Sequence, residues 1–395
     1  MKRDLGLYCD DIIAAINKIE EYTRGSSFEQ FSKDQKTQDA VTRNIEIIGE
    51  AVKKIPPEFK QKYPLAMWRE AAAMRDVLIH DYPDVIPKVV WDQLLFPQWV
   101  LPRALNHAKP DVVLYTNNYI SMWGRYPKVV IIHDMTPFII PSTFYWLHGF
   151  YQRSYFRISA KRSQKIITVS ENSRKDICRI LKVPEDKVVV VMNATSLKDH
   201  QSPDPSVLEK FNINLPFILY VGAIHPRKNI DRLIQAFDRL KMSREIPHQL
   251  VVVGRHRWGK QVSASKFLSS IIFVDSLSDA QLVVLYQSCE VFVYPSLYEG
   301  FGLPVLEAMS YGAAVVTSKA SSLPEVAGDA AVLVDPYDVD NIADGIWRLI
   351  SQPDLRRELR EKGLRQSALF SWKRSAKKVL EILESIKCLK NNEPA

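Results

Sequence analysis

Two glutamates in one glycine-containing segment are the residues of this chain best placed for chemistry. Glu299 and Glu307 lie eight positions apart, with the tripeptide 300–302 (Gly-Phe-Gly) next to the first of them. A buried strand is predicted to end at Tyr294, and a helix is predicted to begin shortly after the tripeptide. Glycines let a backbone approach a ligand closely, and a helix start suits a phosphate. Because each carboxylate can accept bonds from two hydroxyls, the segment predicts a polyol ligand such as a sugar or a ribose.

A second segment carries two adjacent cations. Arg227 and Lys228 lie in the run 222–229 (Gly-Ala-Ile-His-Pro-Arg-Lys-Asn), directly after a predicted strand that begins the same α/β series. The carboxyl edge of a parallel sheet is where such folds bind ligands. Two cations at this edge can neutralise a diphosphate leaving group. Each segment also has a simpler structural interpretation. Arg227 and Lys228 could be a solvated basic pair on a loop. The segment of the two glutamates could be a strand–turn–helix corner in which Glu299 is solvated and Glu307 caps the helix.

Together these segments resemble the retaining family-4 glycosyltransferases of GT-B fold. The resemblance extends to 132–137 (Ile-His-Asp-Met-Thr-Pro), 169–173 (Val-Ser-Glu-Asn-Ser), 191–193 (Val-Met-Asn) and the final Phe-Ser-Trp with its helix. It implies a nucleotide-sugar donor, transfer of a hexose-type sugar with retention of configuration, and no metal or other cofactor. The acceptor would be a saccharide or a lipid-linked molecule.

The resemblance also implies a role for each matching residue. Glu299 would contact donor-sugar hydroxyls, Glu307 the ribose, and His133 would lie near the reacting sugar. The remaining residues would bind the donor through backbone N–H groups or side-chain cations: Gly300, Phe301, Gly302, Arg227 and Lys228. For His133 the plainer alternative is a core histidine at a strand end. The proposed chemistry of this family is a front-face reaction in which the leaving phosphate helps to deprotonate the acceptor.

The match covers about 97–386 but begins late. Family members open with a strand, a glycine-rich loop and further strand–helix units that have no counterpart here. About four strands remain in the first half, starting with the run 111–115. That strand is expected to expose an edge. Since the missing loop lines the acceptor side in the family, donor binding is better supported than transfer.

The first part of the chain predicts a helical bundle with a site of its own. Apolar residues recur at three- and four-residue spacing in 5–19 and in about 37–54, and two further helices are expected at about 66–80 and 86–95. The third contains Arg75 and His80, followed by Tyr82. Arginine can hold a phosphate and histidine can exchange a proton near neutral pH, which would suit metal-free RNA cleavage. The spacing by itself is a weak pattern that a structural helix could also show.

These first 96 residues resemble the HEPN bundle of the DUF86, or HepT-like, toxins that pair with minimal nucleotidyltransferases. The resemblance rests on several runs in addition to Arg-x4-His-x-Tyr: 10–13, 22–25, 37–41 and 43–51. It implies a ribonuclease site built from Arg75 and His80 at a homodimer cleft. It also implies an antitoxin partner that nucleotidylates Tyr82.

Composition bounds the remaining possibilities. With 46% apolar and 25% charged residues and a formal net charge of +8, the 395 residues read as a globular, basic, multidomain chain suited to acidic partners. The four cysteines are widely spaced and predict neither zinc nor disulfides. The N-terminus lacks the apolar core of a signal peptide. A cytoplasmic protein is expected, compatible with a peripheral position at the inner membrane face.

The predicted architecture is an all-α bundle followed by an α/β GT-B unit of two Rossmann-like halves, the first truncated. The bounds are 1–96 for the bundle, 97–205 and 206–371 for the two halves, and 372–395 for the crossover helix and tail. The leading interpretation is a UDP- or GDP-sugar glycosyltransferase. The alternatives are a HEPN ribonuclease toxin component, or a chimeric chain that binds donor without turnover, because the junction near residue 91 lacks a linker.

Overall fold

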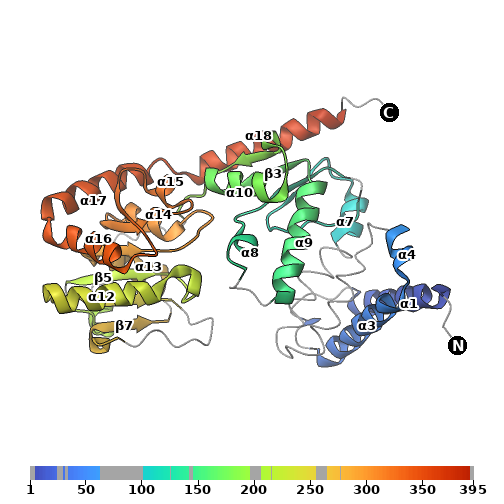
Figure 1. Cartoon of the computed structure of the whole chain (residues 1–395). Coiled ribbons are helices and arrows are strands. Elements are labelled where there is room, and N and C mark those ends of the chain that lie inside the picture. The colour runs from blue at the N-terminus through green and yellow to red at the C-terminus, as the bar shows by residue number, and fades with distance from the viewer. Residues whose placement is uncertain are drawn as a thin grey trace. The chain divides into compact units, whose positions relative to one another are not determined.

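The protein was analysed as a computed structural model (Figure 1). The structure describes residues 5–24, 30–31, 34–62, 101–124, 126–141, 146–195, 206–214, 216–254, 265–275 and 277–391. The chain divides into two compact units. Unit 1 comprises Met1–Tyr115, Tyr119–Lys128 and Tyr145–Arg162, and unit 2 comprises Thr116–Asn118, Val129–Phe144 and Ser163–Ala395.

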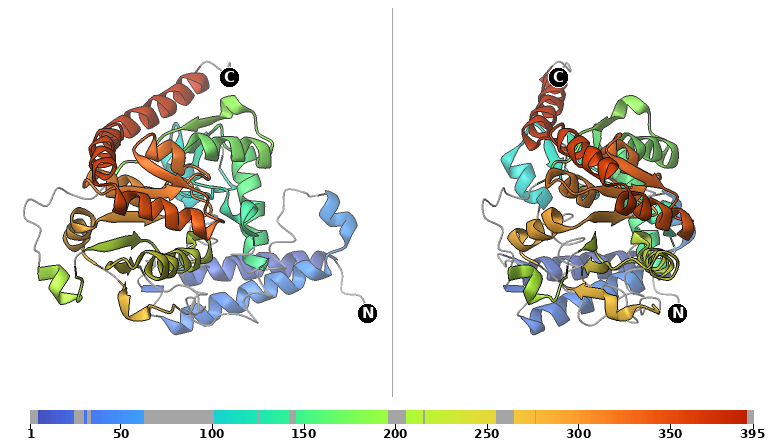
Figure 2. Two further views of the ribbon diagram at one scale, coloured as in Figure 1. Left: turned by 60° about the vertical axis from the view of Figure 1, so that its left-hand side comes forward. Right: turned by 90° about the vertical axis from the view of Figure 1, so that its left-hand side faces the viewer.

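Unit 1 contains the predicted helices of the N-terminal bundle that the structure describes. Helices α1 (Leu5–Thr23) and α3 (Gln35–Lys54) pack against each other, as the two long blue helices of Figure 2 show. The apolar faces of the two helices are buried by this packing, and Ile19, Val41 and Val52 are among the buried residues. Asp34 caps α3, since its carboxylate accepts the N–H of Thr37 at 3.1 Å. The predicted helices at 66–80 and 86–95 lie outside the described residues.

Three further described helices belong to unit 1. They are α4 (Pro57–Lys62), α7 (Leu101–Ala108) and α9 (Trp146–Arg162). Buried aromatic rings anchor α9, with Tyr155 and Phe156 each about 1% exposed. The ring of Tyr119 meets that of Tyr155 edge to face, at a centroid separation of 5.3 Å.

Four strands form the smaller sheet in the order β1-β2-β3-β4. They are β1 (Val113–Tyr115), β2 (Lys128–Ile131), β3 (Lys165–Thr168) and β4 (Val188–Val190). Strand β3 pairs in parallel with both β2 and β4. The prediction of four strands in a shortened half is confirmed, and within the described residues β1 stands at one end of the order. Helix α8 (Thr136–Ile139) follows β2, and α10 (Glu171–Leu181) follows β3.

The larger sheet has six parallel strands in the order β10-β9-β8-β5-β6-β7. They are β5 (Phe217–Val221), β6 (Gln249–Val253), β7 (Ile271–Val274), β8 (Val291–Tyr294), β9 (Val315–Ser318) and β10 (Ala331–Val334). The central strands are buried on both faces, as their continuous apolar runs predicted. The order reverses between β5 and β8, and this is the switch point where doubly wound sheets bind ligands.

Eight described helices belong to the part of the chain that begins at Ser206. They are α11 (Ser206–Lys210), α12 (Ile230–Arg244), α13 (Asp279–Ser288), α14 (Leu303–Ser310), α15 (Leu323–Ala327), α16 (Val339–Ser351), α17 (Pro353–Ser367) and α18 (Trp372–Asn391). Ser278 caps the start of α13 in a capping box. Its hydroxyl accepts the N–H of Gln281, and the side chain of Gln281 accepts the N–H of Ser278. The last helix is tied down near its start, because Ser375 Oγ donates to the carbonyl of Met192 at 2.5 Å.

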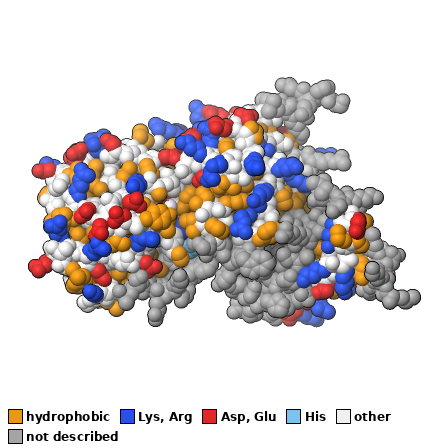
Figure 3. Space-filling view, in the orientation of Figure 1, with side chains coloured by type: hydrophobic (Ala, Val, Ile, Leu, Met, Phe, Trp, Pro, Cys, Tyr) orange, Lys and Arg blue, Asp and Glu red, His pale blue; other side chains and the backbone are white. Residues whose placement is uncertain are grey.

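Two kinds of feature are absent from the part of the chain that the structure describes. No helix among them is long and apolar enough to cross a membrane. No group of three or more His, Cys, Asp or Glu side chains in the same ranges is arranged to hold a metal ion. On the face drawn in Figure 3, Lys and Arg side chains of the described residues are interspersed with Asp and Glu.

Candidate functional site

The candidate site lies in unit 2 at the carboxyl ends of the strands that flank the switch point. Arg227 and Lys228 follow β5 in a single 3-10 turn, and Glu299 follows β8. The two loops are bonded to each other, since the N–H of Leu297 donates to the carbonyl of Arg227 at 2.9 Å. Asn229 closes the turn in the left-handed conformation and donates to the carbonyls of Pro295 and Pro336. The sheet topology therefore brings the two predicted motifs together.

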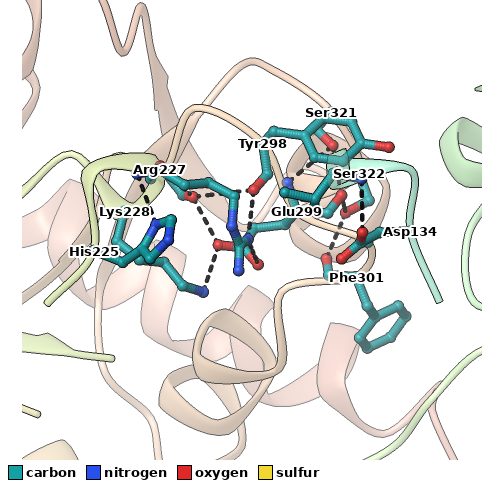
Figure 4. A network of polar contacts seen from close by, with 12 residues as sticks. Asp134, His225, Arg227, Lys228, Tyr298, Glu299, Phe301, Ser321 and Ser322 are labelled. Carbon is teal, nitrogen blue, oxygen red and sulfur yellow. Dashed lines mark hydrogen bonds and ion pairs between the residues drawn. The ribbon is translucent and has the colours of Figure 1, made fainter. Parts of the chain in front are cut away.

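The carboxylate of Glu299 lies between the two cations (Figure 4). Its Oε2 is 2.8 Å from Arg227, and its Oε1 accepts from Lys228 Nζ at 2.6 Å. Two neutral hydroxyls also donate to Oε1, that of Tyr294 at 3.0 Å and that of Ser296 at 2.7 Å. Only 9% of the Glu299 side chain is exposed, so its charge is stabilised by these partners and hardly by water.

The pKa values record this arrangement. Burial would raise the pKa of Glu299, but the charges of Lys228 and Arg227 outweigh it and lower the pKa to about 2. For Arg227, burial disfavours the cation, yet Glu299 and Asp134 together raise its pKa. For Lys228, burial outweighs the attraction of Glu299 and lowers the pKa. Glu299 is therefore an anion at every pH at which the protein would work.

Serine hydroxyls from another part of the chain fix the loop after Glu299. Ser170 and Ser173, at the start of α10, both donate to the carbonyl of Gly300, at 2.7 and 3.2 Å. In a trans peptide the C=O and the following N–H point in opposite directions, so the N–H of Phe301 faces away from α10. Among the described residues, no hydrogen bond occupies the N–H groups of 300–302. This leaves a short row of donors that can bind an anion or a hydroxyl oxygen.

The same loop approaches the end of β2 closely enough to require glycine. A Cβ atom on Gly300 would lie 2.4 Å from the carbonyl oxygen of His133 and 2.9 Å from the Cβ of Asp134. Gly302 has a φ of +109°, which side chains other than glycine rarely adopt. Gly300 thus approaches protein backbone on one side, whereas a Cβ atom on Gly302 would meet the side chain of Leu323 at 2.6 Å.

His133 lies at this approach, and its side chain is exposed rather than buried in the core. Its Nε2 is 3.3 Å from the carbonyl of Thr116, and its own carbonyl accepts from Ser173 at 3.3 Å. Asp134 accepts the N–H of Thr136 at 2.8 Å. The alternative of a core histidine is therefore not what the structure has.

Glu307 occupies the second turn of α14, on the side of α13. Its carboxylate accepts from the hydroxyl of Tyr286 at 3.0 Å. Burial raises the pKa of Glu307 to about 7, and the bond from Tyr286 only partly opposes this. In contrast to Glu299, no cation is paired with it among the described residues. A half-buried carboxylate of this kind is a candidate for binding a ligand's hydroxyls.

Sequence reasoning missed the residues that hold the site in place. Tyr294 and Ser296 fix the Glu299 carboxylate, and Ser170 and Ser173 fix the following peptide. Ser322 donates to the carbonyls of Glu299 and Phe301 and completes the support. The only signal for Tyr294 and Ser296 was their position at the end of a strand. The predicted residues Arg75, His80 and Tyr82 of the bundle lie outside the described residues.

A parallel α/β sheet with an acidic and basic cluster at its switch point defines a class, the nucleotide-binding α/β proteins. Comparison with known proteins shows to which family within this class the chain belongs. Residues 207–366 match the family model described as glycosyl transferases group 1, and residues 12–94 match that of ribonuclease HepT-like. The O-antigen chain mannosyltransferase B of Escherichia coli is 34% identical over 272 residues, which cover 66% of this chain and 71% of that protein.

Two further similarities complete the comparison. The probable ribonuclease HepT of Thermococcus cleftensis is 54% identical over 91 residues, 23% of this chain and 83% of that protein. The structure of Anabaena Alr3699/HepE in complex with UDP-glucose superposes with a TM-score of 0.55 at 18% identity, covering 66% of this chain and 73% of that one. The chain belongs to the group 1 glycosyltransferases, with the GT-B fold, and carries a segment of the HepT-like family at its N-terminus. Both resemblances read from the sequence are confirmed.

Replacing Gly300 by alanine should damage the site. Because the added Cβ would overlap the carbonyl of His133, the loop must move and the N–H groups of 300–302 lose their alignment. We expect a loss of stability of about 1–3 kcal/mol and a fall in donor turnover of at least about tenfold. Urea unfolding and nucleotide release would measure the two effects.

Gly312→Ala is the matched control for this change. Gly312 also has a positive φ, of +73°, but the nearest atom to its added Cβ is 4.0 Å away. It should therefore lose stability through backbone strain and keep its turnover. Equal turnover in Gly300→Ala and wild type would contradict the close approach.

Glu307→Gln should stabilise the protein in a pH-dependent way. The folded pKa of about 7 lies above the ordinary 4.5, so the wild type loses stability as pH rises from 4.5 through 7. The amide carries no charge and can still accept from Tyr286. We expect the variant to be more stable by roughly 1–3 kcal/mol above pH 7, with the difference vanishing near pH 4.5. Urea unfolding from pH 5 to 8 tests this, and a difference independent of pH would refute it.

Proposed function

We propose that this chain transfers a hexose-type sugar from a nucleoside diphosphate sugar, with retention of configuration, and that the sugar is mannose. The carrying observation is the buried cluster of Glu299, Arg227 and Lys228 beside the row of N–H groups at 300–302. The name of the E. coli mannosyltransferase supports the choice of sugar. The UDP-glucose in the Anabaena structure supports a nucleotide-sugar donor, and we propose that its nucleoside diphosphate is UDP or GDP.

Each group would have a separate task. Glu299 accepts bonds from donor-sugar hydroxyls, and Glu307 accepts those of the ribose. Arg227 and Lys228 neutralise the diphosphate, whose negative charge grows as the glycosidic bond breaks. The N–H groups of Gly300, Phe301 and Gly302 add donors at the same place. We propose that no metal or other cofactor takes part, and that Arg227 and Lys228, partly offset by Glu299, provide the positive potential together with these N–H groups.

Retention fits a front-face reaction. The acceptor hydroxyl attacks from the side of the leaving diphosphate, whose oxygen takes the proton. His133 is exposed at the end of β2 and would lie near the reacting sugar. We propose a saccharide or lipid-linked acceptor. The net charge of +8 would favour a peripheral position at an anionic membrane face.

A donor panel tests the proposed transfer. Purified full-length protein should release nucleoside diphosphate from UDP- or GDP-sugars, most readily from a mannose donor. In Glu299→Ala, release should fall by at least about 100-fold, because the bond to the sugar and the alignment of both cations are lost. Product release assays with GDP-mannose, UDP-glucose and related donors would measure it.

Two outcomes would contradict the proposal in different ways. Tight donor binding without release in any acceptor mixture would favour a chimeric chain that binds donor without turnover, as the shortened first half allows. Release unchanged in Glu299→Ala would place the chemistry elsewhere.

A second function is favoured by the 54% identity of the N-terminal segment to the probable HepT ribonuclease. We propose that Arg75 and His80 cleave RNA at a homodimer cleft, Arg75 holding a phosphate and His80 exchanging the proton of the attacking 2′-hydroxyl. Tyr82 would be the target of a nucleotidyltransferase antitoxin.

The two activities can be separated with crossed variants. His80→Ala should lose at least about 100-fold of any RNA cleavage and keep donor turnover, whereas Glu299→Ala should do the opposite. Gel analysis of a labelled single-stranded RNA would measure the first activity. RNA cleavage that persists in His80→Ala would show that the Arg-x4-His motif is not its source.

A further inference from the structure

The Glu299 carboxylate is held by neutral groups in addition to the two cations beside it. Its Oε1 accepts from the hydroxyls of Tyr294 and Ser296, two neutral groups on its own segment, and Ser321 and Ser322 both donate to its carbonyl. Tyr294 and Ser296 are fully buried. These neutral bonds do not involve the cations' charges, so they can keep Glu299 in place when a diphosphate binds to the cations.

This fixed charge already uses part of what the cations can offer. Arg227 is 2.8 Å and Lys228 2.6 Å from the carboxylate, and Lys228 also contacts the hydroxyl of Tyr294. The cluster therefore carries one net positive charge rather than two. Unlike charges attract and like charges repel strongly where water is largely excluded, so a diphosphate bound here feels Glu299 as well as the cations.

Donor and product differ in what they present to that carboxylate. The donor brings sugar hydroxyls that can donate to Glu299, together with a diphosphate esterified at both ends. Transfer breaks the bond between the sugar carbon and the terminal phosphate oxygen, which keeps the electron pair. The product has gained a negative charge, because a terminal phosphate carries close to two charges at neutral pH, and it has lost the hydroxyls.

We propose that Glu299, in addition to binding the donor sugar, weakens binding of the nucleoside diphosphate product and so promotes its release. This role rests on the proposed function, since it assumes that the diphosphate is held by Arg227 and Lys228. It is a role in selecting donor over product at one site. Its signature is a variant that binds product more tightly than the wild type does.

Calorimetric titration of the full chain with UDP and GDP tests the proposal. Glu299→Gln, which keeps the size and removes the charge, should bind the preferred nucleoside diphosphate at least tenfold more tightly, or about 1.4 kcal/mol. Donor turnover should fall in the same variant. Glu299→Asp retains the charge but places it one methylene farther from the diphosphate. Its affinity for the nucleoside diphosphate should lie between those of the wild type and Glu299→Gln.

Glu290→Gln is the matched control. Glu290 precedes β8 at the opposite end of the strand and also pairs with an arginine, Arg356, at 2.6 Å. Its loss should leave nucleotide affinity unchanged. Unchanged affinity in Glu299→Gln would overturn the proposal, and weaker affinity would show that Glu299 serves only to hold the cations in place.

Two further outcomes remain distinct. A wild type that binds neither nucleotide would refute the donor site itself and hence the proposed function. If Glu299→Gln does not fold, as circular dichroism would reveal, Glu299→Asp carries the test: tighter product binding supports the role, and equal or weaker binding refutes it.

Discussion

A buried carboxylate between two cations is the interaction on which the rest of unit 2 depends. An isolated charge in such surroundings would be neutralised or would destabilise the site, so the ionised Glu299 depends on Arg227 and Lys228. These residues follow different strands, β8 and β5, which are neighbours only where the strand order reverses. The doubly wound topology therefore creates the site, and the ion cluster in turn joins the two loops at its edge.

The surrounding polar groups convert this cluster into an oriented surface. Serines of α10 hold the carbonyl of Gly300, and Ser322 holds those of Glu299 and Phe301. With its carbonyls engaged, the loop keeps its N–H groups for another partner. Glu307 differs from Glu299 in its electrostatic surroundings. No cation pairs with it in the described structure, and burial raises its pKa to about 7. Glu299 is thus paired with two cations, whereas among the described residues the carboxylate of Glu307 is bonded to the hydroxyl of Tyr286 alone.

The chain combines two families whose segments meet without a recognisable linker. The HepT-like match ends at residue 94, and the first strand of the shortened half begins at Val113. The four strands that remain still bring β2 and α10 to the loop of Glu299. Within the described residues, the loop after Glu299 therefore keeps its support although the smaller sheet has only four strands.

The sequence alone determined much of this protein. Continuous apolar runs predicted all six strands of the larger sheet, because a strand buried on both faces shows its burial in its own sequence. Residue types and their spacing also singled out the candidate site residues Glu299, Glu307, Arg227 and Lys228. Only the tertiary structure decided which groups support them. Ser170 and Gly300 are 130 positions apart, and nothing local to either predicts their bond. The difference between the two glutamates was likewise invisible, since a pKa depends on neighbours that only the folded chain brings together.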